Sequence, residues 1–220
     1  MERREMVGIT SFGAYIPLHR LARAEFAKAW GGRALPGEKA VANFDEDSLT
    51  IAVEAAIESR VTITGAFDDA SASYYGGLVV TDNKQRRILK RKKIPEDHRA
   101  LFHVPSQKSY TANADMKAFR KLAQISKSAH RLALNGYHWE ALTLNGLAHA
   151  LVLGWEPTIA IDALQAGAIA AGLSGKGPAT VAITKTESVS KIRSAMSKFE
   201  GQIIEAKLNN MKARILDEHT

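Results

Sequence analysis

The strongest constraint on the fold is a glycine-rich segment in the last quarter of the chain. Residues 172–178 read GLSGKGP, with three glycines in six positions. Glycine adopts positive φ angles and has no β-carbon, so such a segment can turn tightly and admit another group close to its backbone. Successive amides in a turn of this kind can bind an anion, and Ser174 and Lys176 add a hydroxyl and a charge. A tight helix-to-strand turn without a ligand explains the same residues, and both interpretations stay open here.

Strand-like and helical patterns are mixed along the rest of the chain. The Asn135-Gly136 pair and Gly154 mark two expected helix ends, because Asn and Gly favour the left-handed conformation there. The predicted fold class is α/β in the broad sense (α+β), with helices against one face of a sheet. Strands are expected at 7–16, 61–64, 74–81, 100–104, 179–184 and 202–208, and helices at 21–30, 45–58, 115–134, 138–153, 157–170 and 189–199.

Composition excludes several classes of site. The chain has no cysteine, which rules out disulfides, thiolate metal sites and cysteine nucleophiles. Its seven histidines are scattered without zinc-type spacing, so no metal ligand is predicted. No apolar run approaches the ~20 residues that span a bilayer. The N-terminus has no long apolar segment of the signal-peptide kind. We therefore expect a cytoplasmic protein with no membrane partner.

The net charge of +7 is concentrated in one segment. Residues 84–93 (KQRRILKRKK) carry seven basic side chains and no acidic one, and without them the chain is neutral. A protein that binds nucleic acid over its whole surface would spread its charge more widely, so no nucleic-acid partner is predicted. A solvated edge strand or hairpin explains the segment most simply. Attraction of an anionic ligand such as a nucleotide is the alternative.

Two further groups of polar residues are candidates for chemistry. Asp68 and Asp69 stand side by side between small residues, where they could act as a general base, bind magnesium or cap a helix. Asn145 and His149 are four positions apart and therefore share one helical face. A single histidine on a helix is more often structural than catalytic, so His149 is not promoted to a site residue.

Several of these segments together resemble a known family. Residues 57–214 resemble the archaeal-type shikimate kinases, which are members of the galactokinase, homoserine kinase, mevalonate kinase and phosphomevalonate kinase (GHMP) superfamily. The similar segments occur in the same order over more than two thirds of the chain. They are residues 61–73 (VTITGAFDDASAS), 81–84 (TDNK), 108–111 (KSYT), 142–146 (LTLNG), 167–179 (GAIAAGLSGKGPA) and 205–210 (EAKLNN).

This resemblance implies roles for particular residues. In the superfamily an aspartate that precedes a small-residue run and a Gly-Gly pair orients or deprotonates the substrate hydroxyl. Counting back from Gly76-Gly77 gives Asp69 as that residue, with Asp68 as its neighbour. The glycine-rich segment resembles the motif that lies against the nucleotide phosphates. The implied phosphate-binding residues are Gly172, Ser174, Gly175, Lys176 and Gly177, and the implied substrate-binding residue is Asn145.

The family's main phosphate loop (PxxxGLxSSA or close to it) is not found ahead of the aspartates. Residues 1–56 instead resemble the start of a 3-hydroxy-3-methylglutaryl-CoA synthase of the thiolase-like type, through residues 7–17 (VGITSFGAYIP) and 37–49 (GEKAVANFDEDSL). That family acylates a cysteine, which this chain lacks. The expected chain is thus a hybrid of a thiolase-like fragment (1–56) and a kinase region (57–220). The kinase region is expected to be the C-terminal ferredoxin-like half of the GHMP kinase fold. The thiolase-like fragment is expected to be an α/β appendage.

The predicted function is ATP-dependent phosphorylation of shikimate at its 3-hydroxyl, with Mg²⁺ as cofactor and shikimate as the small-molecule partner. ATP binding is expected to be weaker than in a complete kinase, because the main phosphate loop is not found. The alternatives are an acyl-CoA condensing enzyme and a catalytically inactive binding module built from the kinase region.

Overall fold

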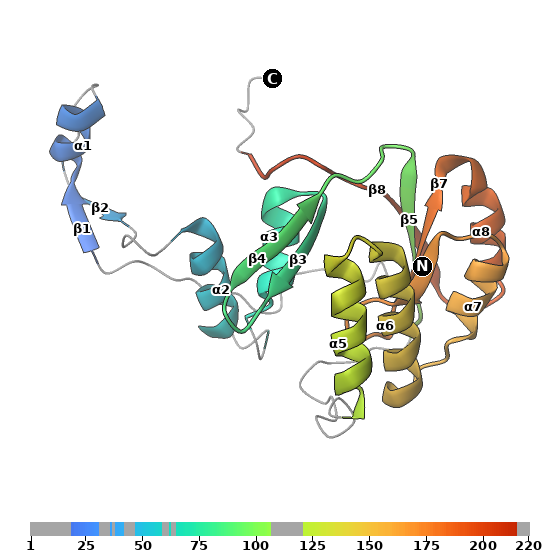
Figure 1. The fold of residues 1–220 in the computed structure, drawn as a ribbon. Helices are drawn as coiled ribbons and strands as arrows, with labels where there is room; N and C mark the ends of the chain where they lie inside the picture. The colour runs from blue at the N-terminus through green and yellow to red at the C-terminus, as the bar shows by residue number, and fades with distance from the viewer. Residues whose placement is uncertain are drawn as a thin grey trace, which may run out of the picture. The chain divides into compact units, whose positions relative to one another are not determined.

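The computed structural model describes residues 19–30, 36, 38–41, 47–58, 62, 65–106 and 121–214. The chain divides into two compact units. Figure 1 labels the helices and strands that they contain. The first consists of residues 1–74 and 83–86, and the second of residues 75–82 and 87–220. Within the described part of the chain, no helix has both the length and the apolar character needed to cross a membrane.

The first unit contains two short strands and two helices ahead of residue 59. Its elements are β1 (His19–Ala22), α1 (Arg23–Trp30), β2 (Glu38–Val41) and α2 (Ser48–Glu58), and β1 pairs antiparallel with β2. Asp47 caps α2, since its Oδ1 accepts a hydrogen bond of 2.8 Å from the Thr50 N–H. Leu49 and Val53 form the buried face of α2. The helix expected at 45–58 is confirmed, whereas the strands expected at 7–16 and 61–64 lie outside the described residues, Thr62 excepted.

The segment from 67 to 92 forms a helix and a hairpin. Helix α3 spans Phe67–Tyr75, and β3 (Leu78–Asp82) pairs antiparallel with β4 (Arg87–Lys92). The strand expected at 74–81 therefore begins too early, because Tyr74 and Tyr75 still belong to the helix and Gly76-Gly77 separates it from the strand. The basic segment lies in the turn and second strand of this hairpin, so its expected placement in a hairpin is confirmed. The role of its charges stays a prediction.

The second unit is built on a four-stranded antiparallel sheet. Its strands are β5 (His98–Val104), β6 (Ala170–Leu173), β7 (Thr180–Lys185) and β8 (Gln202–Lys207). They are arranged in the order β6-β7-β5-β8, and Leu101 at the centre pairs with Ala182 on one side and Glu205 on the other. This is the strand order of a ferredoxin-like βαββαβ unit, as the resemblance implied.

Helices cover both faces of this sheet (Figure 1). The helices are α5 (Ala123–Leu134), α6 (His138–Leu153), α7 (Thr158–Gln165) and α8 (Val189–Met196), and η2 (Thr186–Ser188) is a short 3₁₀ turn. On one face Leu101 packs with α7 and α8, and on the other Ala100 packs with Trp139 and Leu142 of α6. The expectation of helices on one face only was wrong. Consecutive residues of β5 point to opposite faces, and both Ala100 and Leu101 are buried.

The helix expected at 157–170 is shorter than predicted. It ends at Gln165, and Gly167 adopts a φ of 99° that a helix cannot continue. The Ile169 N–H then donates to the Ile183 oxygen at 2.7 Å, which starts the pairing of β6 with β7. The glycine-rich segment is therefore not a helix-to-strand turn, as one interpretation held, but the connection between two antiparallel strands.

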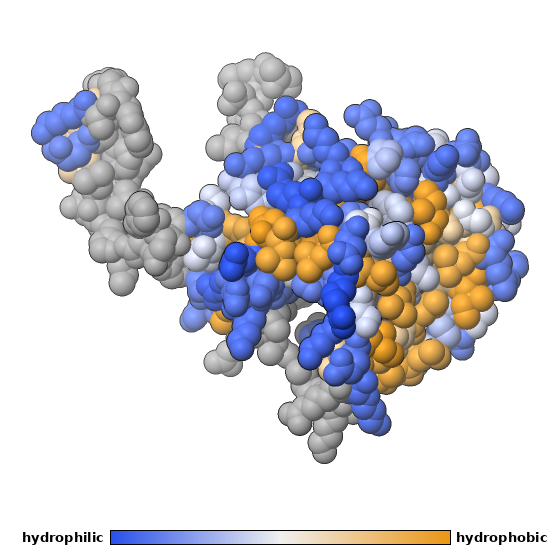
Figure 2. Space-filling view, in the orientation of Figure 1, coloured by the Kyte–Doolittle hydropathy of each residue, from blue (hydrophilic) through white to orange (hydrophobic). Residues whose placement is uncertain are grey.

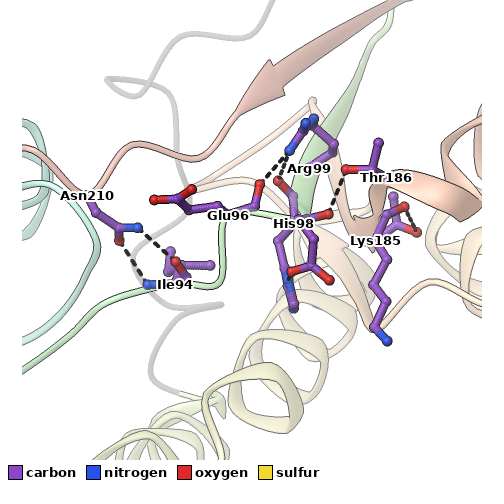
Figure 3. A network of polar contacts seen from close by, with 9 residues as sticks. Ile94, Glu96, His98, Arg99, Lys185, Thr186 and Asn210 are labelled. Carbon is purple, nitrogen blue, oxygen red and sulfur yellow. Dashed lines mark hydrogen bonds and ion pairs between the residues drawn. The ribbon is translucent and has the colours of Figure 1, made fainter.

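Polar contacts join the segment just before β5 to the start of η2 and to the segment after β8 (Figure 3). The N–H and the hydroxyl of Thr186 donate to the backbone oxygen of Asp97, at 2.7 and 2.8 Å. The Asn210 side chain donates to the Ile94 backbone oxygen and accepts from the Ile94 N–H, both at 2.8 Å.

The outer sides of α6 and α7 are in part apolar (Figure 2), with Leu151 66% exposed. The sheet, not the outer helix faces, therefore holds the core of this unit.

Candidate functional site

The two neighbouring aspartates lie in the first turn of α3 in the first unit. Gly65 and Ala66 precede the helix with φ angles of 83° and 48°, so the chain turns sharply before Phe67. Carboxylates at this end of a helix are stabilised by its positive dipole. The placement agrees with the helix-capping interpretation and also exposes both side chains to solvent. A positive φ is rare for alanine, and such strain often accompanies functional sites.

Asp68 and Asp69 differ in their surroundings. The Asp68 Oδ1 accepts a hydrogen bond of 2.7 Å from the Asn83 side chain, which lies in the hairpin turn. The pKa of Asp69 is raised above its usual value of 3.8, first because its carboxyl is partly desolvated and second because Asp68 is negative. A raised pKa makes a carboxylate a better proton acceptor. The pair thus consists of a carboxylate anchored by Asn83 and a carboxylate with a raised pKa.

The Gly76-Gly77 pair marks a place where two backbones meet in the second unit. A β-carbon built on Gly76 would lie 2.5 Å from the backbone oxygen of Met211. The Gly77 N–H donates to the backbone oxygen of Asn209 at 2.7 Å. Both glycines have positive φ angles, 67° and 71°. The structure therefore brings together two segments of the family resemblance, the glycine pair and residues 205–210. Only glycine permits this crossing.

The glycine-rich segment forms a loop of residues 174–179 between β6 and β7, called the glycine loop below. Gly175 and Gly177 have φ angles of 57° and 79°. Two amides are used inside the loop, because Ser174 N–H donates to the Ala179 oxygen at 2.8 Å and Gly177 N–H to the Ser174 oxygen at 2.9 Å. Gly175 is exposed, and no atom of the described residues lies within 4 Å of a β-carbon built on it. An anion would therefore approach the loop at Gly175.

Gly172 has a different place from the other predicted phosphate-binding residues. It is buried in β6, and a β-carbon built on it would lie 2.8 Å from the Gly146 Cα in α6. The absence of a side chain at Gly172 thus allows close contact between helix and strand. Its assignment to phosphate binding stays a prediction, as do those of Ser174, Lys176 and Gly177.

Asn145, the predicted substrate-binding residue, is exposed on α6 directly before Gly146. The Nδ1 of His149 lies 2.8 Å from the backbone oxygen of Asn145, so the histidine contacts the helix backbone and not the amide side chain. This agrees with the structural interpretation of His149. The sequence analysis missed Trp155, whose Nε1 donates to the Lys176 oxygen at 3.0 Å. A lone tryptophan after a helix-ending glycine gives no sequence signal that its indole will bind a backbone oxygen in a distant loop.

Of the predicted residues, Asn145 and the glycine loop lie in the second unit, and Asp68 and Asp69 lie in the first. Among the described residues, no group of three or more His, Asp or Glu side chains is arranged to hold a metal ion. Among the predicted site residues, Asp68 and Asp69 are the two that carry carboxylates.

Comparison with known proteins finds similarity to kinases over much of the chain. Residues 113–201 match the family described as GHMP kinases C terminal. The chain is 42% identical over 172 residues to a shikimate kinase of Methanobrevibacter smithii and 44% identical over 173 residues to one of Methanothermobacter thermautotrophicus. A crystal structure of homoserine kinase from Cytophaga hutchinsonii shares the fold with a TM-score of 0.53 at 19% identity, covering 75% of this chain and 58% of that one.

The extent of these matches bears on the organisation of the chain. The shikimate kinases match 78% and 79% of this chain, and the chain spans 59% and 60% of their length. The matched share is larger than residues 57–220 can supply, so the similarity extends upstream of residue 57. None of these matches supports a synthase segment or a hybrid, and the boundary expected at residue 57 stays a prediction.

Proposed function

We propose that the chain is a kinase of the GHMP superfamily and that it phosphorylates shikimate at the 3-hydroxyl with ATP. The match of residues 113–201 to the family described as GHMP kinases C terminal supports the superfamily. The observation that carries the proposal is the 42% identity over 172 residues to a shikimate kinase. In this reaction the 3-hydroxyl oxygen attacks the γ-phosphorus, its proton leaves to a base, and ADP departs. A cytoplasmic location belongs to the same proposal.

Asp69 is the proposed proton acceptor or orienting group for the substrate hydroxyl. The raised pKa of Asp69 supports this role, because a carboxylate with a raised pKa takes up a proton more readily than one at the usual value. Asp68 is held by Asn83 and is proposed to orient the turn and to keep the local potential negative. Asn145 is the proposed contact to the substrate.

The glycine loop is the proposed site for the nucleotide phosphates. The open side at Gly175 supports this role, because amides and the Lys176 charge near an exposed backbone can neutralise phosphoryl oxygens. Phosphoryl transfer depends mainly on such positioning and charge stabilisation. ATP supplies the transferred group. Mg²⁺ is commonly bound by one or two carboxylates together with substrate phosphates, and Asp68 and Asp69 are the carboxylates proposed for it. Among the described residues no group of three or more His, Asp or Glu side chains is arranged to hold a metal ion.

No observation favours the alternative of an acyl-CoA condensing enzyme, and the chain has no cysteine to acylate. The other alternative, an inactive binding module, is separated from the kinase by experiment. We expect ADP release, followed in a coupled assay, to require the chain, Mg²⁺ and shikimate together. The control substrate 3-dehydroshikimate lacks the 3-hydroxyl and should give no turnover. Equal ADP release with both compounds would contradict the proposal, and nucleotide binding without turnover would favour the inactive module.

A further inference from the structure

We propose that Trp155 is the positioning residue of the glycine loop. Its indole closes one side of the loop, so that the other side, at Gly175, is held ready for the phosphate groups of a nucleotide. This inference rests on the proposed function, since it takes the loop as the phosphate site. It adds a residue outside every segment on which the family resemblance rests.

Contacts on the closed side involve the indole directly. Trp155 lies between α6 and α7, and its Nε1 donates to the Lys176 oxygen at 3.0 Å. A β-carbon built on Gly177 would lie 2.8 Å from Trp155 Nε1 and 2.8 Å from Leu173 Cδ1. The backbone at Gly177 is therefore pressed against the indole and the leucine side chain. The indole and the leucine side chain thus occupy the space on this side of Gly177.

The opposite side of the loop is open. Gly175 is exposed, and its N–H donates to no acceptor among the residues described. A β-carbon built there would meet no described atom within 4 Å. Room for a ligand and an available amide thus coincide at Gly175, two residues from the peptide that Trp155 touches.

A single peptide unit explains how the indole acts on the loop. The Lys176 carbonyl and the Gly177 N–H belong to one planar peptide group, so fixing one fixes the other. The carbonyl accepts from Trp155, and the N–H donates to the Ser174 oxygen at 2.9 Å. Without the indole N–H, the peptide keeps the Gly177–Ser174 hydrogen bond inside the loop but loses its restraint from outside the loop. Ordering a loop on binding reduces affinity, and a loop already ordered avoids that cost.

The test compares two tryptophan-to-phenylalanine variants. Trp155→Phe keeps an aromatic ring but removes the N–H that binds Lys176. Trp139→Phe is the matched control, because Trp139 lies in α6 of the same unit and stacks on His98 with ring centroids 5.9 Å apart. For each variant, amide hydrogen exchange is measured at Gly177, and binding of MgATP and of inorganic tripolyphosphate is measured by calorimetry. Thermal melting verifies that both variants fold.

In Trp155→Phe we expect the Gly177 amide to exchange about tenfold faster and both phosphate ligands to bind about three- to tenfold more weakly, the range for losing one hydrogen bond. In Trp139→Phe both quantities should stay near wild type. Unchanged exchange in Trp155→Phe would overturn the positioning role. Faster exchange with unchanged affinity would overturn the link to the ligand. Wild-type protein that binds neither ligand would overturn the phosphate function of the loop, and the exchange comparison would still report whether the indole holds it.

Discussion

Gly146 of α6 and Gly172 of β6 lie in direct backbone contact. A β-carbon built on Gly146 would lie 2.6 Å from the Gly172 Cα, and one built on Gly172 would lie 2.8 Å from the Gly146 Cα. Beside them, the Ala171 N–H donates to the Thr143 hydroxyl at 3.3 Å. The contact places α6, which carries Asn145, directly beside the strand that leads into the glycine loop. It therefore connects two of the segments on which the family resemblance rests.

Gly146→Ala should destabilise the protein by about 2 to 3 kcal/mol, the usual range for overpacking a close contact. The sign of the change in the free energy of unfolding separates the close contact from helix propensity. Gly146 lies inside a helix, where alanine is otherwise favoured by about 0.5 to 1 kcal/mol over glycine. Urea unfolding followed by circular dichroism measures the change.

Gly154→Ala is the control for this comparison. Gly154 ends α6 with a φ of 74°, but no described atom lies within 4 Å of its built β-carbon. Its substitution should cost only the backbone term of about 1 to 2 kcal/mol. A Gly146→Ala variant that is as stable as wild type, or more stable, would show that helix and strand can separate freely at this contact.

Asn210 lies in the segment 209–211 that crosses Gly76-Gly77, and its side-chain contacts give a second test of stability. Its side chain makes two hydrogen bonds of 2.8 Å to the backbone of Ile94. Asn210→Ala leaves both backbone groups without this partner and should lower the free energy of unfolding by about 1 to 2 kcal/mol. Asn209→Ala is the control, because the Asn209 side chain makes only exposed contacts with Met211. Equal losses in both variants would contradict the specific role of Asn210.

Local patterns predicted much of the second unit. The apolar stripe before Asn135-Gly136 and the glycine at 154 located the ends of α5 and α6, because helix ends depend on a few nearby residues. The number of faces that helices cover was mispredicted. That property depends on whether both sides of β5 are buried. The burial of Ala100 on one face and Leu101 on the other shows this only once the sheet is known.

For the candidate site, the sequence indicated the residue types but not their partners. The resemblance singled out Gly76-Gly77 and the glycines within 172–177 as motif residues. The physical reason for a glycine differs from one position to the next. Gly76 admits the backbone at Met211, Gly172 admits that of Gly146, and Gly175 opens to solvent. Contacts between residues far apart in the chain are not encoded in spacing. Trp155 was missed for the same reason, since its acceptor lies 21 positions away.

His138 makes the stability of the second unit dependent on pH. It is buried at the start of α6, and neither ring nitrogen has a hydrogen-bond partner of normal geometry among the described residues. Burial, followed by the charges of Lys92 and Lys90, lowers the pKa of His138 below 6.5. The unfolded chain therefore takes up a proton first as pH falls. Stability is full above about pH 6.5 and is lost as pH falls through that value towards the folded pKa.

His138→Leu removes this titration, so its melting temperature should fall less than that of wild type between pH 7.5 and pH 5.5. The control is His130→Leu, since His130 is exposed with its Nε2 3.3 Å from the Thr81 oxygen. That variant should keep the wild-type pH dependence. Parallel melting curves for wild type and His138→Leu across this range would remove His138 as the cause.

The last prediction separates the roles of the two aspartates. Asp69→Asn should lower kcat by about 100-fold or more, the usual scale for a positioned base. Its fold should be retained and be at least as stable as wild type at pH 7. A carboxyl whose pKa is raised in the folded state destabilises that state once pH exceeds the folded pKa. The stability difference should therefore disappear as pH falls below about 3.8, where the carboxyl is protonated in both states.

Asp68→Asn should act through Asp69 instead. The amide oxygen of the new side chain can still accept the hydrogen bond from Asn83, so the turn should persist. Because the negative charge of Asp68 is the second cause of the raised pKa of Asp69, removing it should lower that pKa. The acid limb of the kcat/KM profile should then move to lower pH, with a smaller loss of kcat than in Asp69→Asn. An acid limb at the wild-type position in Asp68→Asn would show that Asp69 is not the titrating base.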